Sequence, residues 1–349
     1  MSLRTLRLPA GAALLASAAL VLAGCSGTGT GASGSSGSAS TGTKKAVNIA
    51  LVRQLSTGDF YEQYLSGAQA EAKKLGVNLS TFSADGDNAK QATQLQQATA
   101  AKPGAIIVDH GFTDSLKAPV AAAIAAKIPI VSFDVDTGST DVTTVDQSDA
   151  TIAKDITDKL VSDTGGSAEV IYAYVAGYAP LDKRDAVWKT VKAANTGLKQ
   201  VAQVGVVNAS TAAQTADQVK AALQAHPGVT AILAPYDEFA KGAVQAVNEL
   251  KLNDTVKVYG ADISNADISV ITKSGSPWVA TAATDPANVG AVSVRAAYLR
   301  ATGGTVDAAI EVPPALITQD VLRSKSITTL AGLAEAFPDL ETPDIAAVP

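Results

Sequence analysis

The stretch AVNIALVRQLSTGDFYEQYLSGAQAEAKKLGVNLSTFS, residues 46–83, contains two β-branched runs on either side of an amphipathic segment. The apolar residues of the middle segment fall on one helical face: Tyr61, Leu65, Ala68, Ala72 and Leu75. Gly76 follows this face as a typical helix C-terminal residue. The runs at 46–52 and 77–83 are predicted strands. A strand, a helix and a second strand form the repeating unit of a parallel α/β sheet.

The same alternation continues for more than two hundred residues. Short apolar runs predict further strands at 105–110, 128–133, 168–174, 199–206, 229–236, 256–262 and 278–284. Segments of ten or more residues with helical periodicity separate most of them. The pattern predicts an α/β protein with parallel sheets that carry helices on both faces.

An internal echo predicts two similar lobes. QLQQATAAKPGAIIV begins at Gln94, and QVKAALQAHPGVTAIL begins at Gln218. Both combine a helix, a Pro-Gly break and a buried strand, and Gln94, Pro103 and Gly104 each repeat 124 positions later. Two Rossmann-like lobes with a cleft between them are therefore expected.

The N-terminus has the features of an export signal. Arg4 and Arg7 precede an uncharged apolar run, and the sequence Leu-Ala-Gly-Cys ends it at Cys25, the single cysteine of the chain. Residues 1–24 are predicted to be a signal peptide. The four residues before and at the cysteine resemble the bacterial lipobox, which implies cleavage and lipidation at Cys25, with the protein anchored to the outer face of the cell membrane.

Residues 25–45 are predicted to form a flexible tether, because Ser26–Thr43 contains only Gly, Ser, Thr and Ala. Removal of residues 1–24 takes away two arginines and no acid, so the formal charge changes from −6 to −8. This acidic balance argues against nucleic acid as a partner.

Catalysis has little support in the sequence. The chain has two histidines and one cysteine, and it lacks metal-ligand clusters, a GxSxG elbow and a P-loop. We therefore predict neither enzymatic activity nor a cofactor nor a metal. Paired carboxylates of a glycosidase are the enzymatic alternative.

Acids and aromatic residues gather where the predicted strands end. In open parallel sheets, ligands bind beyond the carboxyl ends of the strands. These ends hold Ser56–Tyr61, Asp109-His110, Asp134–Asp136, Tyr236–Glu238, Asp262 and Thr284-Asp285. Carboxylates accept hydrogen bonds from hydroxyls, and aromatic faces cover the C–H side of a sugar ring. A neutral polyhydroxylated ligand fits best, with a small cation as an alternative.

Four motifs resemble one family. They are VNIALVRQLSTGDFYEQYLSGAQAEAKKLGVNL, IIVDHGFTDSLKAPVAAAIAAKIPIVSFD, HPGVTAILAPYDEFAKGAVQAV and VYGAD. The chain resembles, from Ala46 to about Thr318, the sugar-binding periplasmic proteins of ABC importers, the ribose-binding-like type I group. This implies two lobes joined by three crossings. The implied ranges are 46–147 and 285–312 for the N-terminal lobe, 148–284 and 313–321 for the C-terminal lobe, and 322–349 for a C-terminal extension.

The resemblance also implies a binding site. The ligand-binding positions of the family fall on Phe60, Tyr61, Asp109, Asp134, Tyr236, Asp262 and Thr284. Ribose binders place arginine after the fourth-strand aspartate, where this chain has Val135, and a second arginine where it has Asp182. Arg184 or Lys183 supplies the cation of that second position if the register of the loop around Asp182 shifts. Pentoses, other monosaccharides and sugar alcohols remain open as ligands.

We therefore expect a lipid-anchored, monomeric receptor that captures a small sugar or polyol and presents it to the permease subunits of an ABC importer. The alternative is a sensory receptor that presents the sugar to a membrane kinase. LacI-like repressors share the two-lobe fold, but they carry an N-terminal helix-turn-helix, and the export signal excludes that function.

Overall fold

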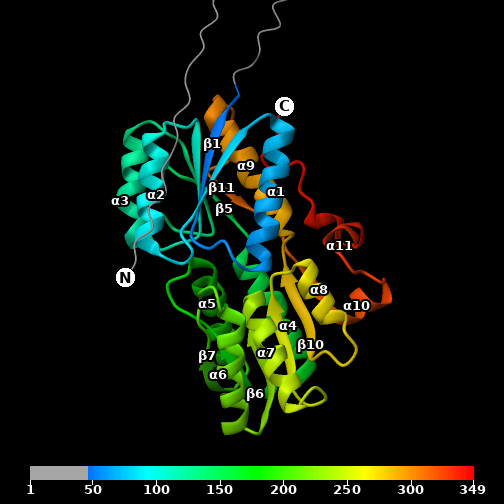
Figure 1. Ribbon diagram of the computed structural model, residues 1–349. Helices are drawn as coiled ribbons and strands as arrows, with labels where there is room; N and C mark the ends of the chain where they lie inside the picture. The colour runs from blue at the N-terminus through cyan, green and yellow to red at the C-terminus, as the bar shows by residue number, and fades with distance from the viewer. Residues whose placement is uncertain (1–45) are drawn as a thin grey trace, which may run out of the picture. The chain divides into compact units, whose positions relative to one another are not determined.

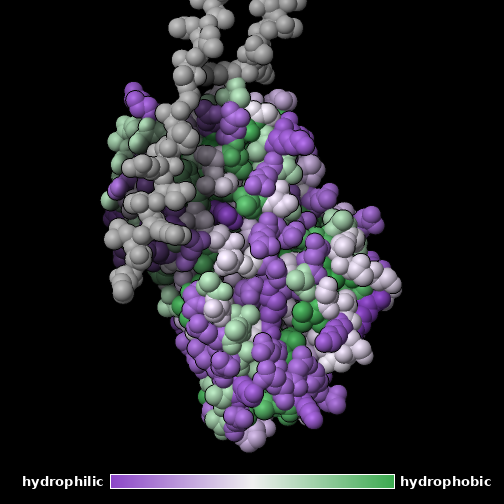
Figure 2. All heavy atoms as spheres, viewed as in Figure 1, coloured by the Kyte–Doolittle hydropathy of each residue, from purple (hydrophilic) through white to green (hydrophobic). Residues whose placement is uncertain are grey.

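The computed structural model describes residues 46–349. The predicted signal peptide, tether and lipidated Cys25 lie outside the described residues. Within residues 46–349, none of the helices combines the length and apolar character needed to span a bilayer. Figure 2 shows hydrophilic side chains over much of the viewed face of this region, as expected for a surface in contact with water.

The first sheet is wholly parallel and belongs to the upper lobe of Figure 1. Its order is β11-β5-β4-β3-β1-β2. The strands are β1 (Asn48–Arg53), β2 (Asn78–Ser83), β3 (Ala105–Asp109), β4 (Ile130–Phe133), β5 (Thr143–Asp146) and β11 (Ala309–Glu311). β1 lies between β2 and β3, so of the two strands in residues 46–83 the first lies inside the sheet and the second, β2, forms its edge.

Two pairs of helices cover this sheet. They are α1 (Asp59–Leu75) with α9 (Pro286–Thr302), and α2 (Asn88–Ala100) with α3 (Thr113–Ala125). Figure 1 shows the two pairs on opposite sides of the sheet. α1 and α9 approach so closely that a Cβ at Gly67 would lie 1.9 Å from the carbonyl oxygen of Ala287. Glycine is therefore required at that crossing.

The second sheet repeats this plan in the lower lobe of Figure 1, with the order β12-β10-β9-β8-β6-β7. Its strands are β6 (Ser167–Ala173), β7 (Gly197–Val204), β8 (Val229–Ala234), β9 (Lys257–Ala261), β10 (Trp278–Ala283) and β12 (Ala315–Thr318). β12 is antiparallel to β10, and the other pairs are parallel. Five helices accompany the sheet: α4 (Asp149–Thr164), α5 (Ala179–Ala194), α6 (Thr211–Ala225), α7 (Asp237–Leu250) and α8 (Asn265–Thr272).

The internal echo corresponds to equivalent places in the two sheets. The helix before Pro103-Gly104 leads into β3, which is the neighbour of β1. The helix before Pro227-Gly228 leads into β8, which is the neighbour of β6 in the same relation. The repeated sequence therefore builds the same strand position in each lobe.

The chain passes between the sheets three times, after β5, after β10 and between β11 and β12. This confirms the predicted class, two α/β lobes joined by a three-segment hinge. The periodicity had not indicated β5, β11 or β12, because these strands are only four, three and four residues long.

The C-terminal segment packs on both lobes. It contains α10 (Gln319–Ser324), α11 (Leu330–Ala336) and a 3-10 turn at Pro338–Leu340. Leu333 and Leu340 are buried in the core of the second lobe. Beyond them, the Arg295 guanidinium of α9 donates hydrogen bonds to the carbonyl oxygens of Thr342 and Ile345, so the chain end returns to the first lobe.

Candidate functional site

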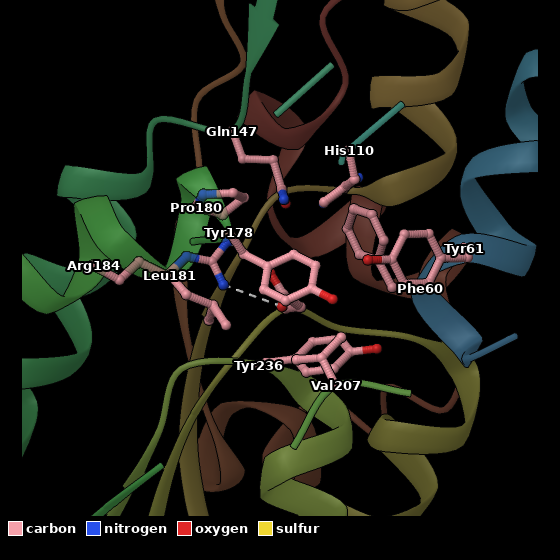
Figure 3. A pocket seen from close by; sticks show the side chains of 11 residues that line it. Phe60, Tyr61, His110, Gln147, Tyr178, Pro180, Leu181, Arg184, Val207 and Tyr236 are labelled. Carbon is pink, nitrogen blue, oxygen red and sulfur yellow. Dashed lines mark hydrogen bonds and ion pairs between the residues drawn. The ribbon is translucent and has the colours of Figure 1, made fainter. Parts of the chain in front are cut away.

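A cleft lies where the carboxyl ends of the two sheets face each other. The space between its side chains is about 400 Å³ when the part open to solvent is included, and the room left for the centre of a water-sized sphere is about 40 Å³. The lining residues come from both lobes and from the crossing between them: Phe60, Tyr61, His110, Gln147, Tyr178, Pro180, Leu181, Arg184, Val207, Tyr236 and Asp262. Figure 3 shows these side chains converging on one space.

The first lobe contributes two aromatic rings and one imidazole, which we call the first wall. Phe60 and Tyr61 stand in the first turn of α1, with ring centroids 5.7 Å apart in an edge-to-face arrangement. Phe60 also stacks on Phe133 at 6.2 Å. Burial raises the pKa of Tyr61 well above 10, so its hydroxyl remains a neutral donor and acceptor.

His110 completes the first wall, directly after β3. Its Nδ1 lies 2.5 Å from Oδ1 of Asp109, and its side chain is 8% exposed. Asp109 is fully buried and does not line the cavity. His110, Asp134 and Asp262 all have left-handed backbone, with φ of 54°, 49° and 68°. Such conformations are costly for residues other than glycine and concentrate at functional sites.

A polar network behind the cleft joins two crossings of the chain. Gln147 Nε2 donates to Asp134 Oδ2 at 2.6 Å, and Gln147 Oε1 accepts from the Thr284 hydroxyl at 2.8 Å. Gln147 lines the cavity, whereas Asp134 and Thr284 stand behind it. Burial, with the charge of Asp149 nearby, raises the pKa of Asp134 to about 8.

The second lobe contributes a mostly apolar surface, which we call the second wall. Tyr178, Pro180 and Leu181 lie at the start of α5, Val207 follows β7, and Tyr236 immediately precedes α7. In Figure 3, Val207 and Tyr236 lie at the bottom of the cavity, opposite Gln147 and His110. This wall offers van der Waals contact more than hydrogen bonds.

The charges of the second wall are paired with one another. The Arg184 guanidinium donates to Asp149 Oδ1 at 2.9 Å and to the two oxygens of Asp262 at 3.1 and 3.2 Å. It also donates to the carbonyl oxygen of Pro235 at 2.9 Å. The side chain of Arg184 is 2% exposed. Burial raises the pKa of Asp262, and the guanidinium opposes that shift. This geometry orients Asp262 before any ligand arrives.

Direct contacts hold the two lobes together across the cleft. Lys241 of α7 lies 2.5 Å from Asp59 of α1 and 2.5 Å from Glu238. In addition, the ring of Phe112 in the first lobe packs against the ring of Tyr178 in the second, with their centroids 4.7 Å apart. The lobes are therefore closed on each other.

Among the described residues, a cluster of three aspartates has the spacing of a cation site. Carboxylate oxygens of Asp134, Asp146 and Asp149 lie within 4.8 Å of one another. Lys183 Nζ lies 3.0 Å from Asp146 and 3.7 Å from Asp149, and Arg184 binds Asp149 as well. These two side chains already supply the positive charge that a metal ion would bring.

The predicted site residues divide into two groups. The cavity is lined by Phe60, Tyr61, Arg184, Tyr236 and Asp262. Asp109, Asp134 and Thr284 stand one layer behind, and their contact with a ligand stays a prediction. Sequence reasoning did not place Gln147, Tyr178, Pro180, Leu181 and Val207 in the site. Both Tyr178 and Val207 had a positional signal, because they stand four residues and one residue beyond the ends of the predicted strands 168–174 and 199–206.

Comparison with known proteins gives one family. Residues 49–305 match the model of the periplasmic binding protein domain. The ribose import binding protein of Salmonella typhimurium is 28% identical over 271 residues, which cover 77% of this chain and 90% of the relative.

Solved structures agree in fold and size. A 5-methylthioribose transporter solute-binding protein from Thermotoga lettingae, in complex with 5-methylthioribose, is 41% identical with a TM-score of 0.83, and the match covers 84% of this chain and 93% of that one. A solute-binding protein from Agrobacterium vitis with bound allitol is 26% identical with a TM-score of 0.75, over 81% and 98% of the two chains.

Proposed function

Because this chain belongs to the periplasmic binding protein family and is the sugar- or polyol-binding component of an ABC importer, we propose a specific ligand class for it. That class is a pentose with an apolar substituent, and 5-methylthioribose is its first candidate. The observation that carries the proposal is the mostly apolar second wall, in which Leu181, Val207 and the ring of Tyr236 face the cavity.

The physical argument assigns one part of the ligand to each wall. A pentose ring has an apolar C–H face and several hydroxyls, which suit the aromatic rings, His110 and Gln147 of the first wall and the crossing. A methylthio group has no hydrogen-bonding hydrogen and is favoured on the second wall. Burial of two heavy apolar atoms contributes about 1.5 kcal/mol, roughly a tenfold gain in affinity.

Two further observations support this class. The structure from Thermotoga lettingae, at 41% identity, has 5-methylthioribose bound. Ribose binders have an arginine after the fourth-strand aspartate, and this chain has the apolar Val135 at that position, 5% exposed. Loss of that guanidinium removes a hydroxyl-binding group and favours a less polar ligand.

A thermal-shift screen tests the ligand class. The full chain carrying Cys25→Ser, which prevents lipidation, would be screened against 5-methylthioribose, D-ribose, D-arabinose, allitol and a small amine. A ligand at 1,000 times its dissociation constant stabilises the folded state by about 4 kcal/mol. We expect the largest shift with 5-methylthioribose. A larger shift with an unsubstituted pentose or the amine would overturn the proposal.

We also propose that Cys25 carries the lipid anchor. The arrangement of the basic start, apolar run and Leu-Ala-Gly-Cys motif supports it. Cell fractionation of the wild type and of Cys25→Ser gives the test: the wild type should sediment with membranes and the variant should be soluble. Equal membrane retention of both would contradict the anchor.

Finally, we propose that the rigid bodies are 46–147 with 285–312 and 148–284 with 313–321, and that the receptor is a monomer without catalytic activity. Closure around the sugar presents both lobes to the permease. Small-angle scattering checks this, because ligand should reduce the radius of gyration of a monomer. An unchanged radius on saturation would contradict closure.

A further inference from the structure

His110 is a cavity side chain held from behind by a carboxylate. Its Nδ1 lies 2.5 Å from Asp109 Oδ1, and its ring lies edge-on to Phe133 at 5.1 Å and to Tyr61 at 5.2 Å. Its backbone N–H donates to the carbonyl oxygen of Phe133, and its own carbonyl oxygen accepts from Gln91 Nε2 at 2.9 Å. Backbone and ring are therefore both fixed in orientation.

The second ring nitrogen of His110 is available to a ligand. The carboxylate oxygen of Asp134 faces Nε2 at 3.9 Å, which is too long for a hydrogen bond. Among residues 46–349, Nε2 makes no hydrogen bond to a side chain, and its ionic neighbour is Asp134 at 3.9 Å. Asp109, in contrast, is fully buried, and its Oδ1 is already engaged by the ring. A sugar in the cleft therefore meets the imidazole rather than Asp109.

We infer that His110 is a specificity-determining residue whose Nε2–H donates a hydrogen bond to a sugar hydroxyl. Asp109 is a positioning residue that acts through Nδ1. This inference rests on the proposed function, since it requires a hydroxylated ligand in this cleft.

The charges around the ring favour its protonated form. Burial alone would lower the pKa of His110, but the hydrogen bond and charge of Asp109, aided by Asp134 and Asp149, raise it above the usual 6.5. The charged groups that act on the ring are Asp109, Asp134, Asp149 and Asp262, and the titratable Tyr61 packs edge-on against it.

This arrangement predicts a pH dependence of affinity. Below the raised pKa of His110, both ring nitrogens carry protons and Nε2 donates to the ligand. When pH rises through that pKa, the remaining proton stays on Nδ1 against Asp109, and Nε2 loses its donor. Affinity should then fall about tenfold. Asp109→Asn removes the charge that raises the pKa, so the fall should begin at lower pH.

Three substitutions separate the roles of the two nitrogens. His110→Gln places an amide donor near Nε2 and should weaken binding of 5-methylthioribose or D-ribose about tenfold, with loss of the pH dependence. His110→Asn places its donor near Nδ1 and should weaken binding about a hundredfold. His226→Gln changes the only other histidine of the sequence, half-buried at the end of α6, and should leave affinity unchanged.

The imidazole nitrogens give a readout without ligand. In full-length Cys25→Ser protein labelled with ¹⁵N-histidine, two rings contribute signals, and His226→Gln assigns them. We expect the His110 midpoint above 6.5, its movement to lower pH in Asp109→Asn, and a perturbation of its Nε2 signal on addition of sugar. A merely structural histidine would not show this last change.

The outcomes distinguish the two proposals. If the wild type binds a pentose while His110→Gln and His110→Asn bind it equally well, the role of His110 is overturned and the proposed function stands. If the wild type binds neither 5-methylthioribose nor D-ribose, the proposed ligand class is wrong, and the proposed contact between His110 Nε2 and a sugar hydroxyl is wrong as well. An unmoved His110 midpoint in Asp109→Asn overturns the positioning role in either case.

Discussion

The two walls of the cleft solve different recognition problems with similar strand ends. The first wall presents the imidazole of His110 to the cavity, and beside it the crossing presents Gln147, which is hydrogen-bonded to Asp134 behind it. The second wall pairs its arginine with Asp149 and Asp262 and presents Leu181, Val207 and Tyr236. The difference teaches that charge in a cleft is available to a ligand only where no protein partner has taken it.

The largest expected effect comes from a substitution that breaks the ion pairs of Arg184 within the second wall. Arg184→Met leaves Asp149 and Asp262 buried without their guanidinium. Removal of one partner from a buried ion pair costs about 3–5 kcal/mol. The free energy of unfolding from urea titrations should fall by that amount.

Lys183→Met is the matched control on the same helix. Its side chain is 44% exposed, and its ammonium lies 3.0 Å from Asp146. An exposed pair contributes at most about 1 kcal/mol. Equal losses for Arg184→Met and Lys183→Met would show that the arginine is not structural and would return it to the ligand-binding role predicted from the sequence.

The second prediction tests whether the apolar substituent of the ligand contacts the second wall while its hydroxyls contact the first wall. Val207→Thr keeps the shape of the side chain but adds a hydroxyl to the second wall, where an unpaired polar group costs about 1–3 kcal/mol. Affinity for 5-methylthioribose should fall about tenfold in calorimetry, while affinity for D-ribose should change less than threefold. A parallel fall for both sugars would contradict an apolar subsite at Val207.

The smallest effect concerns the contact between lobes beside the two walls. Asp59→Asn removes the ion pair that crosses from α1 to α7 but leaves Lys241 with Glu238. A partly exposed pair contributes about 0.5–1 kcal/mol to closure, so sugar affinity should fall two- to fivefold. Glu62→Gln, an exposed acid on α1, is the control. Unchanged sugar affinity in Asp59→Asn would show that Lys241 acts only within the second lobe, through Glu238, and does not contribute to closure.

The sequence was sufficient for the architecture because hydrophobic periodicity and the βαβ order specify parallel sheets. The rule that ligands bind beyond strand ends also placed Phe60, Tyr61, Tyr236 and Asp262 at the cleft. Arg184 was predicted only through a register shift, and the structure places it in the cavity wall.

The rest required three-dimensional contacts. The strand-end rule selects Asp109 and His110 equally, and the left-handed backbone at His110 determines which of them faces the cavity. Val207 also follows a strand, β7, but its side chain is apolar, whereas the strand-end rule was applied to acids and aromatic residues. Asp134 carries the expected chemistry, but Gln147 stands between it and the cavity because two crossings meet there.

The most direct test is a crystal structure of the complex with 5-methylthioribose. The account predicts a ring hydroxyl within about 3 Å of His110 Nε2 and the methylthio group against Leu181, Val207 and Tyr236. A ligand bound in the opposite orientation, with its hydroxyls on the second wall and Arg184 released from Asp262 to bind them, would contradict the division between the two walls.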